Sequence, residues 1–429
     1  MIDLKRLRAA PDEVRAALAR RGDAAVMSLL DELRSLDDRR RALTGQLDAL
    51  KTERNRLALE DAAAVKQHGA LPRETLEQRK ELGLKITGVE HELRSIETVL
   101  GAKALFVPNL PLPGVPDGGA EANRVVRSWG TPRPPGDAVR PHWELGERLG
   151  LLDLPRGAKI SGSGFPLFIG RGARLARGLV SFMLDLHTRE HGYREVAPPF
   201  VVKRETMQGT GQLPKFEDEA YKTSPDDLFL IPTAEVPVTN LHRDEILDGA
   251  LLPLAYTAYT PCFRREAGAA GKDTRGLLRV HQFDKVELVR FVAPETSAAE
   301  LEIITGHAAA VLERLELPYR VVQLAAGDTG FGSAMTYDLE VWAPGVGAWL
   351  EVSSASVFTD FQARRANIRF RPRAGGKPEF VHTLNASGVA LPRTIAALLE
   401  HGQEADGGVR LPRALAPYAG AERLGPAGG

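Results

Sequence analysis

The chain has 429 residues, enough for two or three domains with a large core. Basic and acidic side chains number 56 each, so the net charge neither supports nor excludes a nucleic-acid partner, and any basic surface must be local. Cys262 is the only cysteine, which excludes intramolecular disulfides and metal sites built from several cysteines. There is no apolar run long enough for a membrane span and no signal-peptide core, so we expect a soluble, cytoplasmic protein without a membrane partner.

Leucines spaced alternately four and three residues apart predict a long amphipathic helix near the N-terminus. They occupy positions 29, 33, 36, 43, 47, 50 and 57, and the same spacing returns at Leu82, Ile86, Val89, Leu93, Ile96 and Leu100. The Gly/Pro break at 68–72 is so short that the two helices must fold back as an antiparallel hairpin, about 27–103 within an arm of 1–104. A spacer or dimerisation strut is the commonest meaning of such a hairpin, and an RNA grip is the alternative.

Residues 105–141 are rich in proline and glycine and predict an extended connector. We expect a second domain at 142–418 and a disordered tail at 419–429. In that domain, 172–190 predicts an amphipathic helix, and strands are expected at 228–231, 256–264, 279–292, 319–324, 336–342 and 348–353. Many strands with few crossover helices favour an α+β fold with a mainly antiparallel sheet flanked by helices. Walker and Rossmann glycine motifs are missing, so a nucleotide would be held by side chains.

Residues 263–287 combine charges and an aromatic side chain in a pattern that suits a nucleotide. Strand alternation places Phe283 and Glu287 on one face, as a plate for a base and a carboxylate for an ammonium group. A surface hairpin with solvated charges is the simpler interpretation of a single Arg-x-Glu, but the whole run argues against it. Four arginines, whose guanidinium groups bind polyphosphates well, flank a Gly-rich loop here: Arg264, Arg265, Arg275 and Arg279.

Two more segments place oxygen ligands at the ends of strands. Residues 233–235, Thr-Ala-Glu, put a hydroxyl and a carboxylate at a loop tip, although a turn or helix cap would look the same. In the segment 349–354, alternation places Glu351 beside Ser353 on one face, and Glu351 suits Mg²⁺ next to a phosphate. Ser354 can join them only if the strand bends after Val352.

The segment 385–388, Asn-Ala-Ser-Gly, predicts a loop that enters a helix. Pro392 fits only the first turn of that helix. Arg393 near the helix start opposes the helix dipole, so a bound anion explains it better than stability does. His281 and His382 do not form a pair at ligand spacing, and with a single cysteine in the chain we expect no zinc site.

Together these segments resemble the class II aminoacyl-tRNA synthetases, and among them the bacterial-type seryl-tRNA synthetases, from Met1 to about Tyr418. The resemblance is carried by the joint string of motifs at 142–146, 209–216, 233–235, 263–287, 337–342 and 359–365. It implies that serine is activated with ATP to seryl-adenylate and pyrophosphate, and then passed to the 3'-terminal adenosine of serine tRNA. The arm would grip that tRNA, and the helix before Pro198 would build a homodimer. Selenocysteine tRNA is a further substrate that the resemblance implies and the residues themselves do not show.

The resemblance also implies roles for individual residues. Arg264, Arg393 and Glu351 match catalytic positions, and Glu351 and Ser354 match Mg²⁺ ligands. The positions matching the ATP site are Arg264, Arg265, Glu266, Val280, Phe283, Glu351, Val352, Ser353, Ser354 and Arg393. The positions matching the serine site are Thr233, Ala234, Glu235, Arg264, Glu287, Asn385 and Ser387. Ala386 and Pro392 depart from glycines that are usual in the family, and Pro392 could shift Arg393.

Two rival functions share parts of this pattern. A class II relative that loads an amino acid onto a carrier protein would have this catalytic domain but lack the long hairpin. A non-catalytic RNA-binding homologue should have lost Arg264, Glu287 or Arg393, and all three are present. Both rivals are therefore less consistent with the sequence than a tRNA ligase.

Overall fold

The computed structural model describes residues 1–136, 139–267, 275–372 and 375–425. The chain divides into a helical unit, residues 2–19 and 23–108, and a sheet unit that comprises residues 109–429 together with Met1 and 20–22. None of the described helices combines the length and the apolar character needed to cross a membrane.

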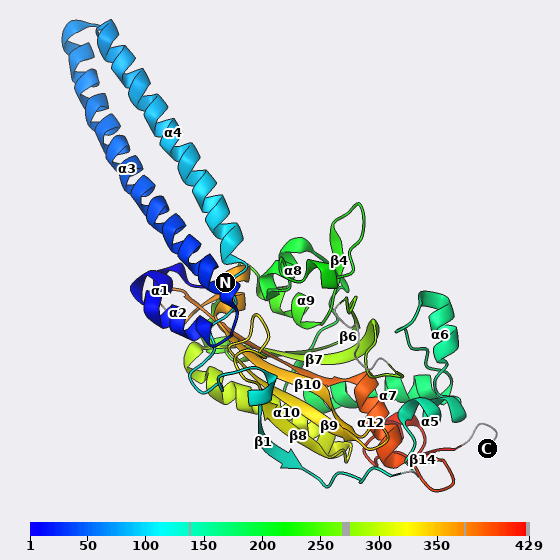
Figure 1. The fold of residues 1–429 in the computed structure, drawn as a ribbon. Helices are drawn as coiled ribbons and strands as arrows, with labels where there is room; N and C mark the ends of the chain where they lie inside the picture. The colour runs from blue at the N-terminus through cyan, green and yellow to red at the C-terminus, as the bar shows by residue number, and fades with distance from the viewer. Residues whose placement is uncertain (137–138, 268–274, 373–374, 426–429) are drawn as a thin grey trace. The chain divides into compact units, whose positions relative to one another are not determined.

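The helical unit contains the predicted antiparallel hairpin (Figure 1). Its helices are α1 (Leu4–Ala9), α2 (Pro11–Ala19), α3 (Ala24–His68) and α4 (Arg73–Ala104). The 45 residues of α3 extend over roughly 68 Å at about 1.5 Å per residue. Gly69 ends α3 in the left-handed region at φ 82°, where its N–H donates to the Val65 carbonyl at 2.8 Å, so the break that the sequence predicts is a glycine cap.

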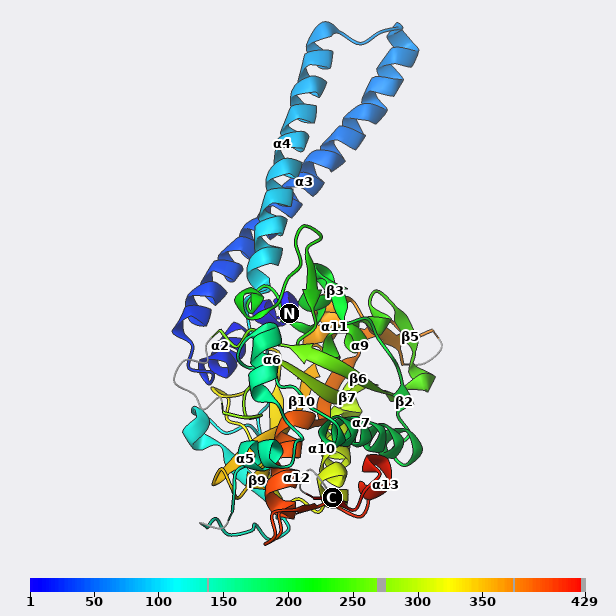
Figure 2. The same ribbon diagram turned by 90° about the vertical axis from the view of Figure 1, so that its right-hand side faces the viewer.

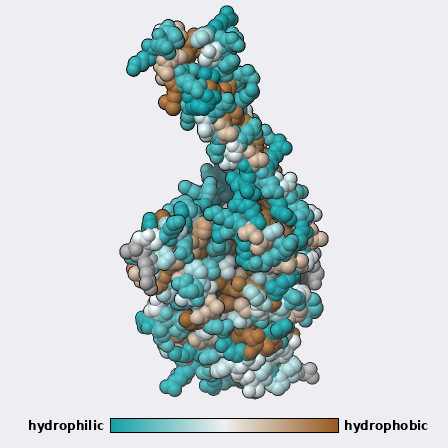
Figure 3. Space-filling model, turned by 90° about the vertical axis from the view of Figure 1, so that its left-hand side faces the viewer, coloured by the Kyte–Doolittle hydropathy of each residue, from teal (hydrophilic) through white to brown (hydrophobic). Residues whose placement is uncertain are grey.

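An apolar seam joins α3 to α4. Its buried members are Leu43, Leu47, Leu82, Ile86, Val89 and Ile96. Ion pairs cross the seam, from Lys51 to Glu90 at 2.8 Å and from Arg79 to Asp61 at 2.8 Å. Hydrophilic residues cover most of the hairpin in Figure 3, as expected for two helices that bury only the stripe facing each other.

An eight-stranded sheet organises the sheet unit in the order β1-β8-β9-β10-β13-β7-β6-β2. Every pairing is antiparallel except that of β2 with β6, which confirms the predicted α+β class. The strands are β1 (Arg124–Trp129), β2 (Arg194–Glu195), β6 (Leu254–Phe263), β7 (Gln282–Val292), β8 (Tyr319–Gln323), β9 (Met335–Ala343), β10 (Ala348–Thr359) and β13 (His382–Ala390).

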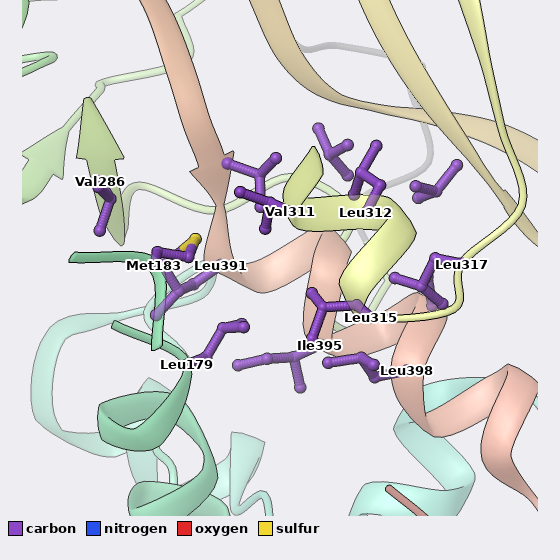
Figure 4. Close-up of a cluster of buried hydrophobic side chains, with 14 of the residues drawn as sticks. Leu179, Met183, Val286, Val311, Leu312, Leu315, Leu317, Leu391, Ile395 and Leu398 are labelled. Carbon is purple, nitrogen blue, oxygen red and sulfur yellow. The ribbon is translucent and has the colours of Figure 1, made fainter. Parts of the chain in front are cut away.

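Three helices, α7 (Arg171–Arg189), α10 (Ser297–Arg314) and α12 (Leu391–Gly402), cover one face of this sheet. Their leucines and isoleucines gather with Val286 in the buried cluster of Figure 4. Val286 and Leu288 of β7 face this cluster, whereas Val289 and Phe291 belong to a second cluster on the other face. The predicted alternation of β7 is therefore confirmed, and it sends Glu287 to the face that the three helices leave open.

Shorter elements border that open face. They are α8 (Arg204–Thr210), α9 (Glu235–Thr239) and α11 (Phe361–Ala366), with the two-stranded sheet β3 (Val201–Lys203) and β4 (Leu228–Leu230) and the three-stranded sheet β5 (Ile246–Asp248), β11 (Arg369–Arg371) and β12 (Glu379–Phe380). The remaining α-helices of the described residues are α5 (His142–Arg148), α6 (Leu154–Ser161) and α13 (Ala416–Ala419).

Three expectations are corrected by the structure. The connector at 105–141 is not merely extended, because its Arg-Val-Val-Arg-Ser-Trp run forms β1 at the edge of the main sheet. Residues 419–425 of the expected disordered tail are structured, since β15 (Arg423–Leu424) pairs with β14 (Val409–Arg410) and Leu424 is buried; residues 426–429 lie outside the described residues. The segment 385–388 is not a loop but part of β13, and α12 begins directly after that strand, with Pro392 in its first turn as predicted.

Candidate active site

The open face of the sheet holds a cleft of about 610 Å³, within the range typical of small-molecule sites. A smaller cavity of about 170 Å³ adjoins it. Both are lined by Arg264, Glu266, Arg279, Lys285, Glu351 and Ser387, so they form one continuous site. Thr233, Glu235, Glu287, Ser354 and Asn385 line the larger cavity, and Val280, Phe283, Val352 and Arg393 line the smaller one.

The predicted aromatic plate and the first guanidinium group lie side by side. The Cζ atom of Arg264 is 5.1 Å from the ring centroid of Phe283, a cation–π contact that holds the arginine over the plate. Phe283 and Glu287 share a strand face, so one strand supplies both the smaller cavity and the larger one. An aromatic ring and a guanidinium group at this spacing suit a base and its phosphate.

A buried pair of opposite charges lies at the bottom of the larger cavity. Lys285 Nζ lies 2.6 Å from Glu287 Oε2 and donates to Thr233 Oγ1 at 2.9 Å. Burial raises the pKa of Glu287, and the charges of Lys285 and Arg264 counteract that rise. Lys285 was not among the predicted site residues, although its position two residues before Glu287 on the same strand face was a signal that could have found it.

The second carboxylate of the cavity belongs to Glu235 in the first turn of α9. Burial, reinforced by the negative charge of Glu287, raises its pKa to about 7. Gln362 donates from Nε2 to Glu235 Oε1 at 2.6 Å, a contact that sequence reasoning missed. Near neutral pH this group is therefore poised between its charged and neutral forms, which is typical of functional carboxylates.

The smaller cavity ends at Arg393, which arrives from a distant part of the sequence. Its Nε donates to the Leu278 carbonyl at 2.9 Å and its Nη1 to the Glu351 carbonyl at 2.8 Å. These bonds hold the guanidinium group in the wall of the same cavity that Arg264 lines. Two positive groups facing one cavity give it the character of a polyphosphate site.

Glu266 and Arg279 form an ion pair in the wall that both cavities share. Glu266 has φ 50°, a left-handed conformation that is uncommon for a glutamate and is held here by its side-chain partner. The sequence singled out Arg279 as one of four arginines but gave it no role. The loop that separates these arginines, 268–274, lies outside the described residues.

A β-bulge in β10 decides which of its side chains reach the site. Glu351 pairs with Glu340 and Ser353 with the next residue, Leu339, so one residue of β10, Val352, is extra. This is the bend that the sequence required for Ser354 to lie on the same face as Glu351. The bend turns Ser353 away from the cleft, and its hydroxyl donates to the Ser387 carbonyl at 2.6 Å in a buried position.

Two other predicted residues are also missing from the cavity walls. Ala234 is fully buried in an apolar cluster, where its small side chain packs beneath β7. Arg265 donates to the Asp218 carbonyl at 3.0 Å, in the segment beside the cleft, instead of turning toward the cavity. Neighbouring arginines in the sequence thus point to different surroundings.

Glu351 and Ser354 provide oxygen atoms of the kind that Mg²⁺ prefers. Asp338 of the neighbouring strand β9 pairs with Ser354 and has a buried Oδ1 without a hydrogen-bond partner, and burial together with the charge of Glu351 raises its pKa to about 8. A cation in front of these carboxylates would relieve that repulsion, so the residues fit a metal ion. Among the described residues, no group of three or more His, Cys, Asp and Glu side chains could hold a metal by itself, so phosphates would have to complete the ligand set.

Comparison with known proteins first identifies the class. The model of the tRNA synthetase class II core domain (G, H, P, S and T) matches residues 215–402, which include most of the cavity lining. The model of the seryl-tRNA synthetase N-terminal domain matches residues 1–111. The antiparallel sheet and its arginine-lined cleft are thus those of a class II aminoacyl-tRNA synthetase.

Full-length relatives narrow the class to one family. The serine--tRNA ligases of Gemmatimonas aurantiaca and Geobacter sulfurreducens are 56% and 55% identical over 421 residues, covering 98% of this chain and 99% of each relative. The crystal structure of seryl-tRNA synthetase from Pyrococcus horikoshii complexed with ATP has a TM-score of 0.95 at 39% identity, with 100% of both chains covered. The chain belongs to the seryl-tRNA synthetase family. The carrier-protein ligase is not favoured, because such a relative would lack the matched N-terminal domain.

Proposed function

We propose that this cleft activates serine with ATP and then transfers the seryl group to tRNA. The observation that carries the proposal is the convergence of Arg264 and Arg393, 129 positions apart in the sequence, on a cavity that adjoins two buried carboxylates. Guanidinium groups bind the phosphates of a triphosphate, and a carboxylate binds the ammonium group of an amino acid. The cavities that offer these groups share a wall, so the two substrates would lie next to each other.

In the first half-reaction, a carboxylate oxygen of serine attacks the α-phosphorus of ATP. The bond from that phosphorus to the bridging oxygen breaks, and pyrophosphate leaves with the electron pair. Arg264 would stabilise the charge that develops at the α-phosphate, and Arg393 the γ-phosphate. Phe283 and Val280 would enclose the adenine, with Glu266 at its edge. Positioning and charge stabilisation suffice, so no protein nucleophile is required.

Serine recognition would use the oxygen-rich end of the cleft. We assign the ammonium group to Glu287, and the remaining contacts to Thr233, Glu235, Asn385 and Ser387. A buried acceptor for the serine hydroxyl would discriminate strongly against alanine, since alanine would leave that acceptor without a partner. When bound with ATP at Glu351 and Ser354, Mg²⁺ would supply additional neutralisation of phosphate charge.

In the second half-reaction, a hydroxyl of the terminal ribose of the tRNA attacks the carbonyl carbon of the adenylate, and AMP leaves. We assign serine tRNA to the hairpin of α3 and α4, and extend the assignment to selenocysteine tRNA on the strength of the resemblance. Charging of the two purified transcripts would test each substrate separately.

We also propose a homodimer that acts in the cytoplasm. The strand β2 ends the main sheet with both of its residues exposed, and the apolar side chains of Phe200 and Val201, a few residues later in the sequence, are exposed by 41% and 43%. An exposed sheet edge next to exposed apolar side chains favours association with a second copy. Sedimentation of the purified protein would measure the assembly.

Exchange of radiolabelled pyrophosphate into ATP tests the proposed site. We expect Arg264→Ala to lose roughly 3 kcal/mol of transition-state stabilisation, a fall of about a hundredfold or more in serine-dependent exchange. Arg265→Ala is the matched control, because that neighbour turns toward Asp218, and it should retain exchange within about threefold. Equal losses in the two variants would contradict the assignment.

A further inference from the structure

Gln362 is a fully buried residue of α11, 1% exposed, that touches the cleft only through other residues. Its Nε2 donates to Glu235 Oε1 at 2.6 Å and to the Thr210 carbonyl at 3.3 Å. Its Oε1 accepts from Thr383 Oγ1 at 2.7 Å. One amide thus connects α11 to α9, to the end of α8 and to β13.

The surroundings determine which way this amide points. If its oxygen and nitrogen were exchanged, Oε1 would face the Thr210 carbonyl, which offers no proton, and the Glu235 carboxyl, which offers none in its charged form. The Thr383 hydroxyl can rotate, so it can either donate to an amide oxygen or accept from an amide N–H. It is therefore compatible with both orientations of the amide. The Thr210 carbonyl and the charged Glu235 carboxylate therefore direct the N–H donor toward Glu235.

Among the influences that favour the charged form of Glu235, the hydrogen bond from Gln362 is the largest. Among the described residues, Gln362 is the side chain that donates to its carboxylate, while the surrounding charges are those of Glu287, Lys285 and Arg264. Burial and Glu287 disfavour the carboxylate form, whereas the Gln362 bond, Lys285 and Arg264 favour it. With Oε1 occupied by the amide, Oε2 is the oxygen left for a ligand in the cleft.

We propose that Gln362 is a positioning residue for serine recognition, which fixes one oxygen of Glu235 so that the other is presented to the substrate. The proposal rests on the serine-binding role proposed above for Glu235. It predicts that Gln362 affects the affinity for serine and leaves the ATP subsite unchanged, since its hydrogen bonds go to Glu235, Thr210 and Thr383.

The test compares Gln362→Met, which keeps the length of the side chain but has no N–H, with the wild-type protein in pyrophosphate exchange. Loss of a hydrogen bond to a charged group should raise the KM for serine about tenfold at pH 7, with the KM for ATP and kcat changed by less than about twofold. Without the donor the pKa of Glu235 moves higher, so the difference in serine KM should shrink to about threefold or less at pH 9.

Gln323→Met is the matched control. Gln323 is also buried, at the end of β8 and outside the cleft lining. Its Nε2 donates to the Gly114 carbonyl at 3.1 Å. It should leave the KM for serine unchanged at both pH values. If Gln362→Met fails to fold, Thr383→Val is the second variant, because it removes only the hydroxyl that donates to Gln362 Oε1. It should raise the KM for serine about threefold with the same pH dependence.

Two outcomes would overturn the proposal. One is a KM for serine within about twofold of wild type in the substituted protein, and the other is an equal rise in the KM values for serine and ATP that does not vary with pH. Glu235→Gln separates this failure from failure of the proposed function. If Glu235→Gln leaves the KM for serine unchanged, Glu235 does not bind serine. If it raises that KM while Gln362→Met does not, the positioning role alone is wrong.

Discussion

Replacement of Glu235 by glutamine should stabilise the fold at alkaline pH while weakening the binding of serine. Glu235 is buried, and its pKa of about 7 lies well above the ordinary value of 4.5. The folded protein therefore holds a proton that the unfolded chain releases. The penalty for ionising this group in the folded state is absent below pH 4.5, grows between pH 4.5 and 7, and is complete above pH 7.

The size of the effect follows from that pKa difference. At pH 8 a raised pKa of this size costs the folded state roughly 3 kcal/mol, and the glutamine variant avoids the cost while keeping an oxygen for the Gln362 amide. We expect the Tm of the variant to exceed that of the wild type clearly at pH 8 and by much less at pH 5. The KM for serine should rise at least tenfold at pH 8, because a charged hydrogen-bond acceptor is lost.

The assay is thermal unfolding at the two pH values, combined with serine-dependent pyrophosphate exchange. Glu295→Gln is the control, since Glu295 is an exposed glutamate that precedes α10, and it should change neither quantity. A Tm difference that is the same at pH 5 and pH 8 would refute the reasoning about the buried charge. An unchanged KM for serine would refute the role of Glu235.

The remaining predictions separate the subsites from each other. Phe283→Ala should raise the KM for ATP about tenfold, as expected for loss of one stacking contact of roughly 1–3 kcal/mol, and leave the KM for serine unchanged; an unaltered KM for ATP would show that the ring does not stack on the base. Replacement of residues 30–100 by a short flexible linker should preserve pyrophosphate exchange and abolish tRNA charging, because the cleft lining lies outside this segment. Normal charging by the shortened protein would contradict a tRNA-binding hairpin.

Local sequence rules predicted the parts of this site that depend on strand geometry. The alternation along β7 places Phe283 and Glu287 on the open face, and the bend after Val352 that Ser354 requires is a β-bulge in the structure. The same bulge turns Ser353 inward, which alternation alone could not foresee. The same alternation could have predicted Lys285 as a site residue, since it lies on the same strand face as Glu287.

Contacts between distant segments were beyond sequence reasoning. Gln362 meets Glu235 across 127 positions, and nothing near either residue in the sequence indicates the other. The strand β1 was missed because proline and glycine dominate the composition of 105–141 and conceal its short β-branched run. The burial of Leu424 could not be predicted either, because it depends on the pairing of its strand with β14.

The central claim is that one cleft brings serine and ATP together for adenylate formation. Pyrophosphate exchange by the purified protein with each of the twenty amino acids in turn tests this claim most directly. We expect exchange with serine to exceed exchange with any other amino acid by at least about a hundredfold. Exchange that is strongest with another amino acid, or absent with serine, would contradict it.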